Sequence, residues 1–211
     1  MKAIIKPMSI LLSAMMIISV FTIVPVGAAA AVTCVDRTWD ADEKKIVETS
    51  TTTTDYTSLS SGITELQTGK YVLDSDVTYS KRLRVKSGAR AELILVNDKT
   101  LKNDKGIIVP ENATLTVYGQ AASGDVKADS GIVDAYNPDG AAIGAMDEEK
   151  TGSIIIMGGT VKATGGTKDA GIGTGKNHSS GFEEIAIYGG NITAQGGKCG
   201  AGIGAGRANS S

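Results

Sequence analysis

The sequence predicts an all-β fold, a right-handed parallel β-helix (solenoid) of about five coils with three short strands per coil. The first observation behind this prediction is a repeat: SIIIMGGTVKATGGTKDAGIG (153–173) returns 31 residues later as EIAIYGGNITAQGGKCGAGIG (184–204). The second is that apolar residues hold the same places in both copies, as stacked parallel strands require. The third is that 22 of the 27 glycines lie from Gly119 onward, where sharp corners are expected. A glycine-rich disordered tail is the alternative, and it does not explain the aligned isoleucines.

Residues 1–30 are predicted to be a secretory signal peptide. Lys2 and Lys6 precede an apolar run from Met8 to Val24, and Ala28-Ala29-Ala30 fits the small-x-small cleavage pattern. An uncleaved membrane anchor is the alternative, because the run is close to the shortest length that spans a bilayer. We therefore expect a secreted, extracellular or cell-surface protein with no membrane span after cleavage. Without the first two lysines the net charge is about −4, which argues against a nucleic-acid partner.

Residues 31–62 differ in composition from residues 63–211. They combine a charged stretch around Trp39 with a threonine-rich run over 48–54. Either a Thr-rich linker or a capping strand fits, and capping is favoured because a solenoid needs its terminal edge covered. The β-helix repeat domain is expected over 63–211, with an irregular first coil that uses 71–73 and 83–86.

Four regular coils are predicted next. Their first strands are 93–96, 115–118, 154–157 and 185–188; their second strands are 100–104, 125–129, 160–164 and 191–195; their third strands are 106–108, 142–144, 171–173 and 202–204. Side chains alternate along a strand, so every second residue faces the core. The predicted inward columns are Leu93, Leu115, Ile154, Ile185; Leu95, Val117, Ile156, Ile187; Leu101, Val126, Val161, Ile192; and Ile107, Ile143, Ile172, Ile203.

The two ends of the rod carry further expectations. No capping element comes after the last third strand, so we expect a C-terminally truncated chain with further repeats or domains beyond Ser211; use of the open edge for self-assembly is the alternative. Cys34 and Cys199 are expected to be unpaired because they lie near opposite ends of the rod. A disulfide bond between them is the alternative, because two cysteines can pair in an oxidising compartment.

The quoted strands, together with LTVYGQ (115–120), GGTVKATGG (158–166) and AGIG (170–173), resemble glycine-rich β-helix repeat regions of large secreted surface proteins of anaerobic Gram-positive bacteria. The resemblance covers most of the chain after residue 30. Proteins of that group are often described as adhesin-like or carbohydrate-binding. The resemblance implies a surface-exposed β-helix, and it assigns no binding residue.

Acidic side chains are the candidates for catalysis, because some β-helix proteins are polysaccharide lyases or hydrolases. Asp104 and Asp129 are placed at equivalent positions of successive second strands, about 5 Å apart, where they could share a cation or a proton. Lys102, Lys127 and Lys162 are predicted to form an outward column beside them, so a solvated, charge-balanced face is preferred. The other aspartates considered are Asp98, Asp125 and Asp134. The sequence therefore predicts no enzyme, no cofactor and no metal site.

Glycan binding is the favoured function. Tyr118, Met157 and Tyr188 are predicted to share one outward column, and sugar rings stack on aromatic faces. Lys102, Lys127 and Lys162 could add affinity for an acidic polysaccharide or cell-surface glycan. The alternative is that a neighbouring segment covers this aromatic column. We thus expect a non-catalytic, adhesin-like repeat module; a fragment of a β-helix lyase or hydrolase and a purely structural stalk are the alternatives.

Overall fold

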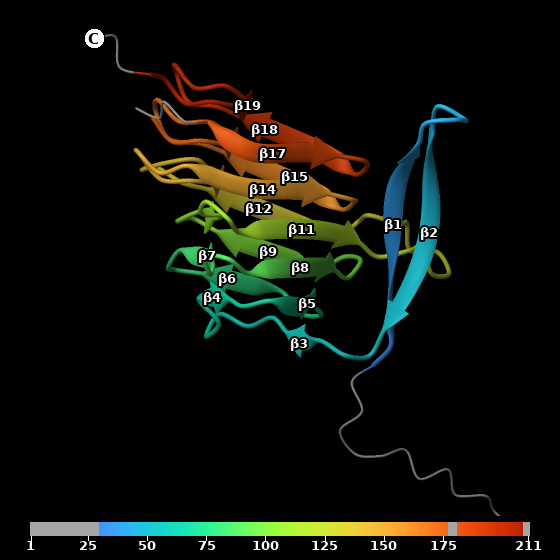
Figure 1. Cartoon of the computed structure of the whole chain (residues 1–211). Helices are drawn as coiled ribbons and strands as arrows, with labels where there is room; N and C mark the ends of the chain where they lie inside the picture. The colour runs from blue at the N-terminus through green and yellow to red at the C-terminus, as the bar shows by residue number, and fades with distance from the viewer. Residues whose placement is uncertain (1–29, 177–180, 209–211) are drawn as a thin grey trace, which may run out of the picture.

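The computed structural model describes residues 30–176 and 181–208, and every regular element in this part of the chain is a β-strand (Figure 1). Residues 1–29, which contain nearly all of the predicted signal peptide, lie outside the described residues. None of the described residues belongs to a helix long and apolar enough to span a bilayer.

Three parallel sheets build a parallel β-helix, as predicted. The first sheet contains β3 (Thr57–Ser58), β5 (Gly69–Leu73), β8 (Arg90–Leu95), β11 (Thr114–Gly119), β14 (Thr151–Ile156) and β17 (Phe182–Ile187). The second contains β6 (Val77–Tyr79), β9 (Thr100–Asn103), β12 (Ile132–Tyr136), β15 (Thr160–Thr164) and β18 (Asn191–Gln195). The third contains β4 (Glu65–Leu66), β7 (Leu83–Val85), β10 (Ile107–Ile108), β13 (Ile143–Gly144), β16 (Ile172–Gly173) and β19 (Ile203–Gly204). The strands from β5 to β19 make five coils of three strands.

The core is a set of aliphatic columns that run up the inside of the coils. The third-sheet column is confirmed: Ile107 aligns with Ile143, Ile143 with Ile172, and Ile172 with Ile203. Leu83 extends this column by one coil toward the N-terminus. Each fully buried aliphatic side chain of this kind stabilises the fold by about 1.5–3 kcal/mol.

Glycine is required where successive coils touch. Gly173 has a φ of 135°, and a Cβ atom at this position would collide with the carbonyl oxygen of Gly204 in the next coil. The repeated Gly-Ile-Gly thus places an inward isoleucine between two positions where backbones approach closely. This explains why the motif recurs in the last two coils.

One predicted second strand is wrong. Residues 125–129 form a loop, and β12 takes the place assigned to them, so that Val133 rather than Val126 aligns with Leu101 and Val161. Val133 is 1% exposed, whereas Val126 is only half-buried. Val126-Lys127-Ala128 and Val133-Asp134-Ala135 alternate apolar and polar residues alike, and the segment that completes the core column forms the strand.

The register between β8 and β11 also differs from the prediction, by two residues. Leu93 aligns with Val117, and Leu115 aligns with Ala91. Leu115, Ile154 and Ile185 stay in one column, as do Val117, Ile156 and Ile187. A two-residue shift keeps every side chain on its predicted face, so the core is retained while the column partners change.

The N-terminal strands β1 (Val32–Asp40) and β2 (Lys45–Thr53) form an antiparallel hairpin. The sequence favours a capping strand over a linker for this segment, whereas the hairpin forms a two-stranded sheet of its own and is not part of any sheet of the coils. Figure 1 shows the hairpin standing beside the stack and running along it, across several coils. Val32 and Cys34 pack on Val72 of β5 and Ile94 of β8. Val72 and Ile94 face away from the core, and yet each is 0% exposed. The hairpin therefore covers the outer face of the first sheet near the C-terminal ends of its strands, and leaves the rest of that face uncovered.

The hairpin is held at its upper part by an ion pair with the coils. The Arg37 guanidinium lies 2.9 Å from an Asp129 carboxylate oxygen and 2.8 Å from Glu48 on β2. It also donates to the carbonyl oxygen of Met157. Asp129 in turn accepts a hydrogen bond from the Gly159 amide at 3.0 Å. The loop 125–129, which was predicted to be a strand, thus contains the residue on which β1 docks.

Candidate functional site

The basic segment KRLRVK (81–86) contains β7, and alternation along this strand decides which charges reach solvent. Leu83 and Val85 are 0% exposed and face the core, so Arg84 points outward between them. Lys81 and Arg82 come immediately before the strand. Lys105 immediately precedes Gly106 and β10 of the next coil, and β10 pairs with β7. Cations from two adjacent coils are therefore brought to one corner of the solenoid.

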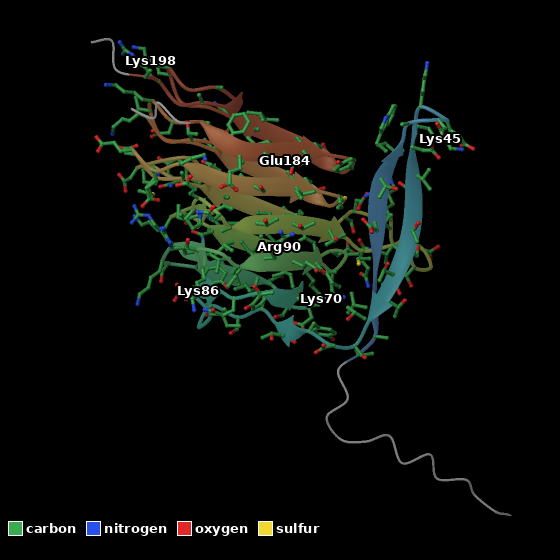
Figure 2. The ribbon with its side chains drawn as sticks, in the orientation of Figure 1. Lys45, Lys70, Lys86, Arg90, Glu184 and Lys198 are labelled. Atoms are coloured by element: carbon green, nitrogen blue, oxygen red, sulfur yellow. The ribbon has the colours of Figure 1, made fainter. Side chains whose placement is uncertain are left out.

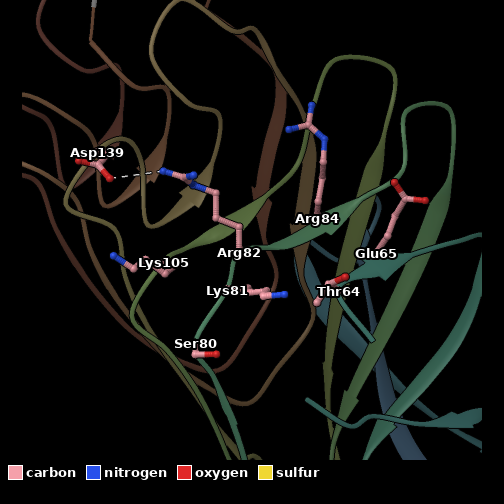
Figure 3. A pocket seen from close by; sticks show the side chains of 8 residues that line it. All are labelled: Thr64, Glu65, Ser80, Lys81, Arg82, Arg84, Lys105 and Asp139. Carbon is pink, nitrogen blue, oxygen red and sulfur yellow. Dashed lines mark hydrogen bonds and ion pairs between the residues drawn. The ribbon is translucent and has the colours of Figure 1, made fainter. Parts of the chain in front are cut away.

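These side chains line an open cleft of about 580 Å³ (Figure 3). Thr64 and Glu65 from the coil below, Ser80, and Asp139 from the coil above complete its walls. The cleft contains four cationic side chains and two acidic ones. We call it the basic cleft; its cations are Lys81, Arg82, Arg84 and Lys105.

The charges of the basic cleft are incompletely neutralised. Arg82 lies 3.4 Å from Asp139, and Arg84 lies 3.7 Å from Glu149, with all four side chains at least 41% exposed. Such long, exposed ion pairs contribute little to stability. Within the described residues, Lys81 and Lys105 form no ion pair. An anionic ligand could replace the weak partners of the arginines, whose planar guanidinium groups bind carboxylates and sulfates through two parallel hydrogen bonds.

The predicted aromatic column exists, but the hairpin lies over part of it. Tyr118, Met157 and Tyr188 come directly after the aligned residues Val117, Ile156 and Ile187, and all three are half-buried. Tyr118 packs against the cluster that contains Cys34. Arg37 reaches the carbonyl oxygen of Met157 and lies against Gly189. A neighbouring segment thus covers much of the column, which was the alternative to an open glycan platform.

The predicted lysine column is interrupted. Lys102 and Lys162 do point outward from β9 and β15, but Asp134 of β12 aligns with both, in the place expected for Lys127. Lys127 lies exposed in the loop that precedes β12. The outer face of the second sheet therefore alternates in charge and is not a continuous cationic surface.

The predicted placement of Asp104 and Asp129 at equivalent positions of successive second strands is also wrong, because residues 125–129 form a loop. Asp104 comes after β9 and lies 3.8 Å from Lys102 at the surface. Asp129 lies in the displaced loop and binds Arg37. Among the described residues no three His, Cys, Asp or Glu side chains gather as a metal site.

The two cysteines are unpaired, as expected: Cys34 is buried under the hairpin and Cys199 is exposed. Burial raises the pKa of the Cys34 thiol. A thiol with a raised pKa stays protonated at neutral pH and is a poor nucleophile.

Sequence reasoning missed the basic cleft, although part of its signal was visible. Residues 83–86 were assigned to a strand, and the alternation of that strand already sends Arg84 outward. The contribution of Lys105 and Asp139 depends on the stacking of three coils, which no local pattern reports.

Comparison with known proteins agrees with this architecture. Residues 154–176 and 185–207 match the family model for the beta helix repeat. The chain contains a β-helix repeat region. The two matched segments include the second and third strands of the last two coils, the most regular copies in the sequence. Neither a curated protein nor a solved structure gave a match. Beta helix repeats occur in polysaccharide-degrading enzymes and in non-enzymatic surface proteins alike.

Proposed function

We propose that this protein is a secreted or cell-surface, non-catalytic module that binds an acidic polysaccharide in the basic cleft. The observation that carries the proposal is the convergence of Lys81, Arg82, Arg84 and Lys105 from two adjacent coils on one open cleft. A uronic-acid chain presents a carboxylate on every sugar, so several cations gathered in one open cleft can bind neighbouring carboxylates of the polymer.

Binding rather than bond cleavage is what the cleft residues support. Its two acids are Glu65 and Asp139, and Asp139 is engaged by Arg82. A lyase or hydrolase requires an acid or base placed beside the scissile bond. The strongest sequence candidates for that role, Asp104 and Asp129, are held separately by Lys102 and Arg37.

The surface setting of the proposal comes from the sequence. The predicted signal peptide and the resemblance to adhesin-like repeat regions of anaerobic Gram-positive bacteria both favour an extracellular location. Further repeats or domains beyond Ser211 would multiply weak contacts along a polymer and raise the overall avidity.

Retention of the purified protein in polygalacturonate gels tests this proposal, with an uncharged β-glucan as the reference polymer. Replacing Arg82 and Arg84 by alanine should raise the Kd for polygalacturonate about tenfold or more, because two charge-assisted contacts are lost. The matched control replaces Lys45 and Lys198 by alanine, which removes the same charge far from the cleft (Figure 2).

Equal weakening in both double variants would show non-specific attraction and contradict a cleft site. Tyr188→Ala distinguishes binding in the basic cleft from binding on the aromatic column. A larger loss in Tyr188→Ala than in the arginine variant would place the glycan on that column.

A further inference from the structure

A second cavity lies under the hairpin, between β1, β2 and the outer face of the first sheet. Its volume is about 170 Å³. Lys70 of β5 and Glu92 of β8 are aligned neighbours on the sheet, and Tyr118 of β11 lies one coil further on. Cys34 and Asp36 approach from β1. Successive strands of the solenoid and the hairpin thus direct polar groups into one hollow.

The polar groups of this cavity do not satisfy one another. Within the described residues, Asp36, Lys70 and Glu92 form no side-chain hydrogen bond or ion pair, and the Tyr118 hydroxyl has no hydrogen-bond partner. Thr51 of β2 adds a hydroxyl group to the opposite wall, where the hydroxyl of Thr53 is already bonded to the backbone of Asp55. The side chains of Asp36, Lys70, Glu92 and Tyr118 are half-buried and their polar atoms remain accessible to water, so a ligand that enters the cavity finds donors and acceptors not already engaged by the protein.

The ionisation of the cavity favours binding over covalent chemistry. Burial raises the pKa of Tyr118 to about 12, and the charges of Asp36 and Glu92 act in the same direction. The phenol therefore remains a hydrogen-bond donor with an intact aromatic face. Burial likewise raises the pKa of the Cys34 thiol, which stays protonated and contributes a small apolar wall.

We propose that this cavity binds a single pyranose ring of a neutral hexose. A cavity of about 150 Å³ accommodates benzene, so about 170 Å³ holds the ring of a hexose while its outer hydroxyl groups lie toward solvent at the half-exposed mouth. The carboxylates of Asp36 and Glu92 accept hydrogen bonds from sugar hydroxyls, Lys70 donates, and the Tyr118 ring packs on the apolar face of the sugar.

The charge of this site is opposite to that of the basic cleft. Two carboxylates face one ammonium group, which disfavours a uronate and favours an uncharged sugar. The proposal does not depend on acidic-glycan binding, because it uses different residues and a different ligand. A polysaccharide with both sugar types could engage the two sites at once.

Saturation-transfer difference NMR with the methyl glycosides of glucose, galactose and mannose tests the proposal on the full chain. At least one glycoside should give a signal, and Glu92→Gln should raise its Kd about tenfold, because a charge-assisted hydrogen bond is lost in a sheltered site. The matched control is Glu184→Gln, which changes an exposed carboxylate on the same sheet (Figure 2).

A second variant fills the cavity. Thr51→Trp should abolish the signal, and an unchanged circular dichroism spectrum would show that the solenoid remains folded. Absence of signal from all three glycosides with the wild-type protein would overturn the proposal, as would a signal that persists in both cavity variants. The arginine-to-alanine variant of Arg82 and Arg84 should bind the glycoside normally, so failure of one site is distinguishable from failure of the other.

Discussion

Replacing Arg37 by methionine should weaken the docking of the hairpin on the solenoid without unfolding the coils. Arg37 is 8% exposed and its partner Asp129 is 18% exposed, so both charges of this pair are largely removed from water. Removing one member of a buried pair costs about 3–5 kcal/mol. In the variant, Asp129 keeps the hydrogen bond from the Gly159 amide and some contact with solvent. The expected cost is therefore at the lower end of this range.

The second partner adds little to this estimate. Glu48 is 59% exposed, so its pair with Arg37 contributes less than about 1 kcal/mol. We therefore expect Arg37→Met to weaken hairpin docking by about 3 kcal/mol, which is a factor of about 100 in the docking equilibrium. Glu48→Gln is the matched control and should change docking by less than about fivefold.

Native-state hydrogen exchange measures this effect locally. Amides of β1 and β2 should lose about 100-fold protection in Arg37→Met, while amides of β14 and β16 stay within about threefold of the wild type. Unchanged hairpin protection would refute the buried-pair estimate. Parallel losses in hairpin and coils would refute the idea that the hairpin is a separate unit.

Two further predictions concern the coils. Ile172→Ala should lower the free energy of unfolding by about 3 kcal/mol in urea titrations followed by circular dichroism, because Ile172 is 0% exposed. Ile203→Ala, in the same column but 46% exposed, should cost less than about 1 kcal/mol, and equal losses would contradict a graded core. Burial, reinforced by the nearby charge of Asp147, raises the pKa of Asp169 above its ordinary value of 3.8. The folded state then binds more protons than the unfolded state just above pH 3.8, so the contribution of Asp169 to stability is greatest below that pH and falls as the pH rises through its folded pKa. Asp169→Asn should remove this fall from urea midpoints measured between about pH 3 and 7, and an unchanged pH profile would contradict the assignment.

The sequence predicted the fold where one residue type recurs at one place in every coil. Ile143, Ile172 and Ile203 were aligned correctly because Ile-Gly occupies the same corner each time. The prediction failed where two nearby segments carry the same alternation. Val126-Lys127-Ala128 and Val133-Asp134-Ala135 have equivalent local patterns, and stacking on the coils above and below selects the second.

The candidate sites were less predictable because they depend on distant contacts. Arg37 and Asp129 are 92 positions apart, and nothing local indicates that the hairpin lies across the aromatic column. The basic cleft likewise combines a basic strand with Lys105 and Asp139 from later coils. Alternation along a strand gives the face on which a side chain lies, whereas coil register decides which side chains meet.

The position of the hairpin also constrains the order in which the molecule folds. β1 is the first strand of the described chain, yet its partners include Tyr118, Asp129 and Gly189, which come much later in the sequence. Contacts across such sequence separations form slowly, whereas each coil needs only its neighbour to propagate. During synthesis the contacts of Arg37 with Asp129 and Gly189 must therefore wait until most coils exist, although Val72 and Ile94 are available earlier. The last step of folding is then to complete the docking of the earliest strands onto a nearly finished rod.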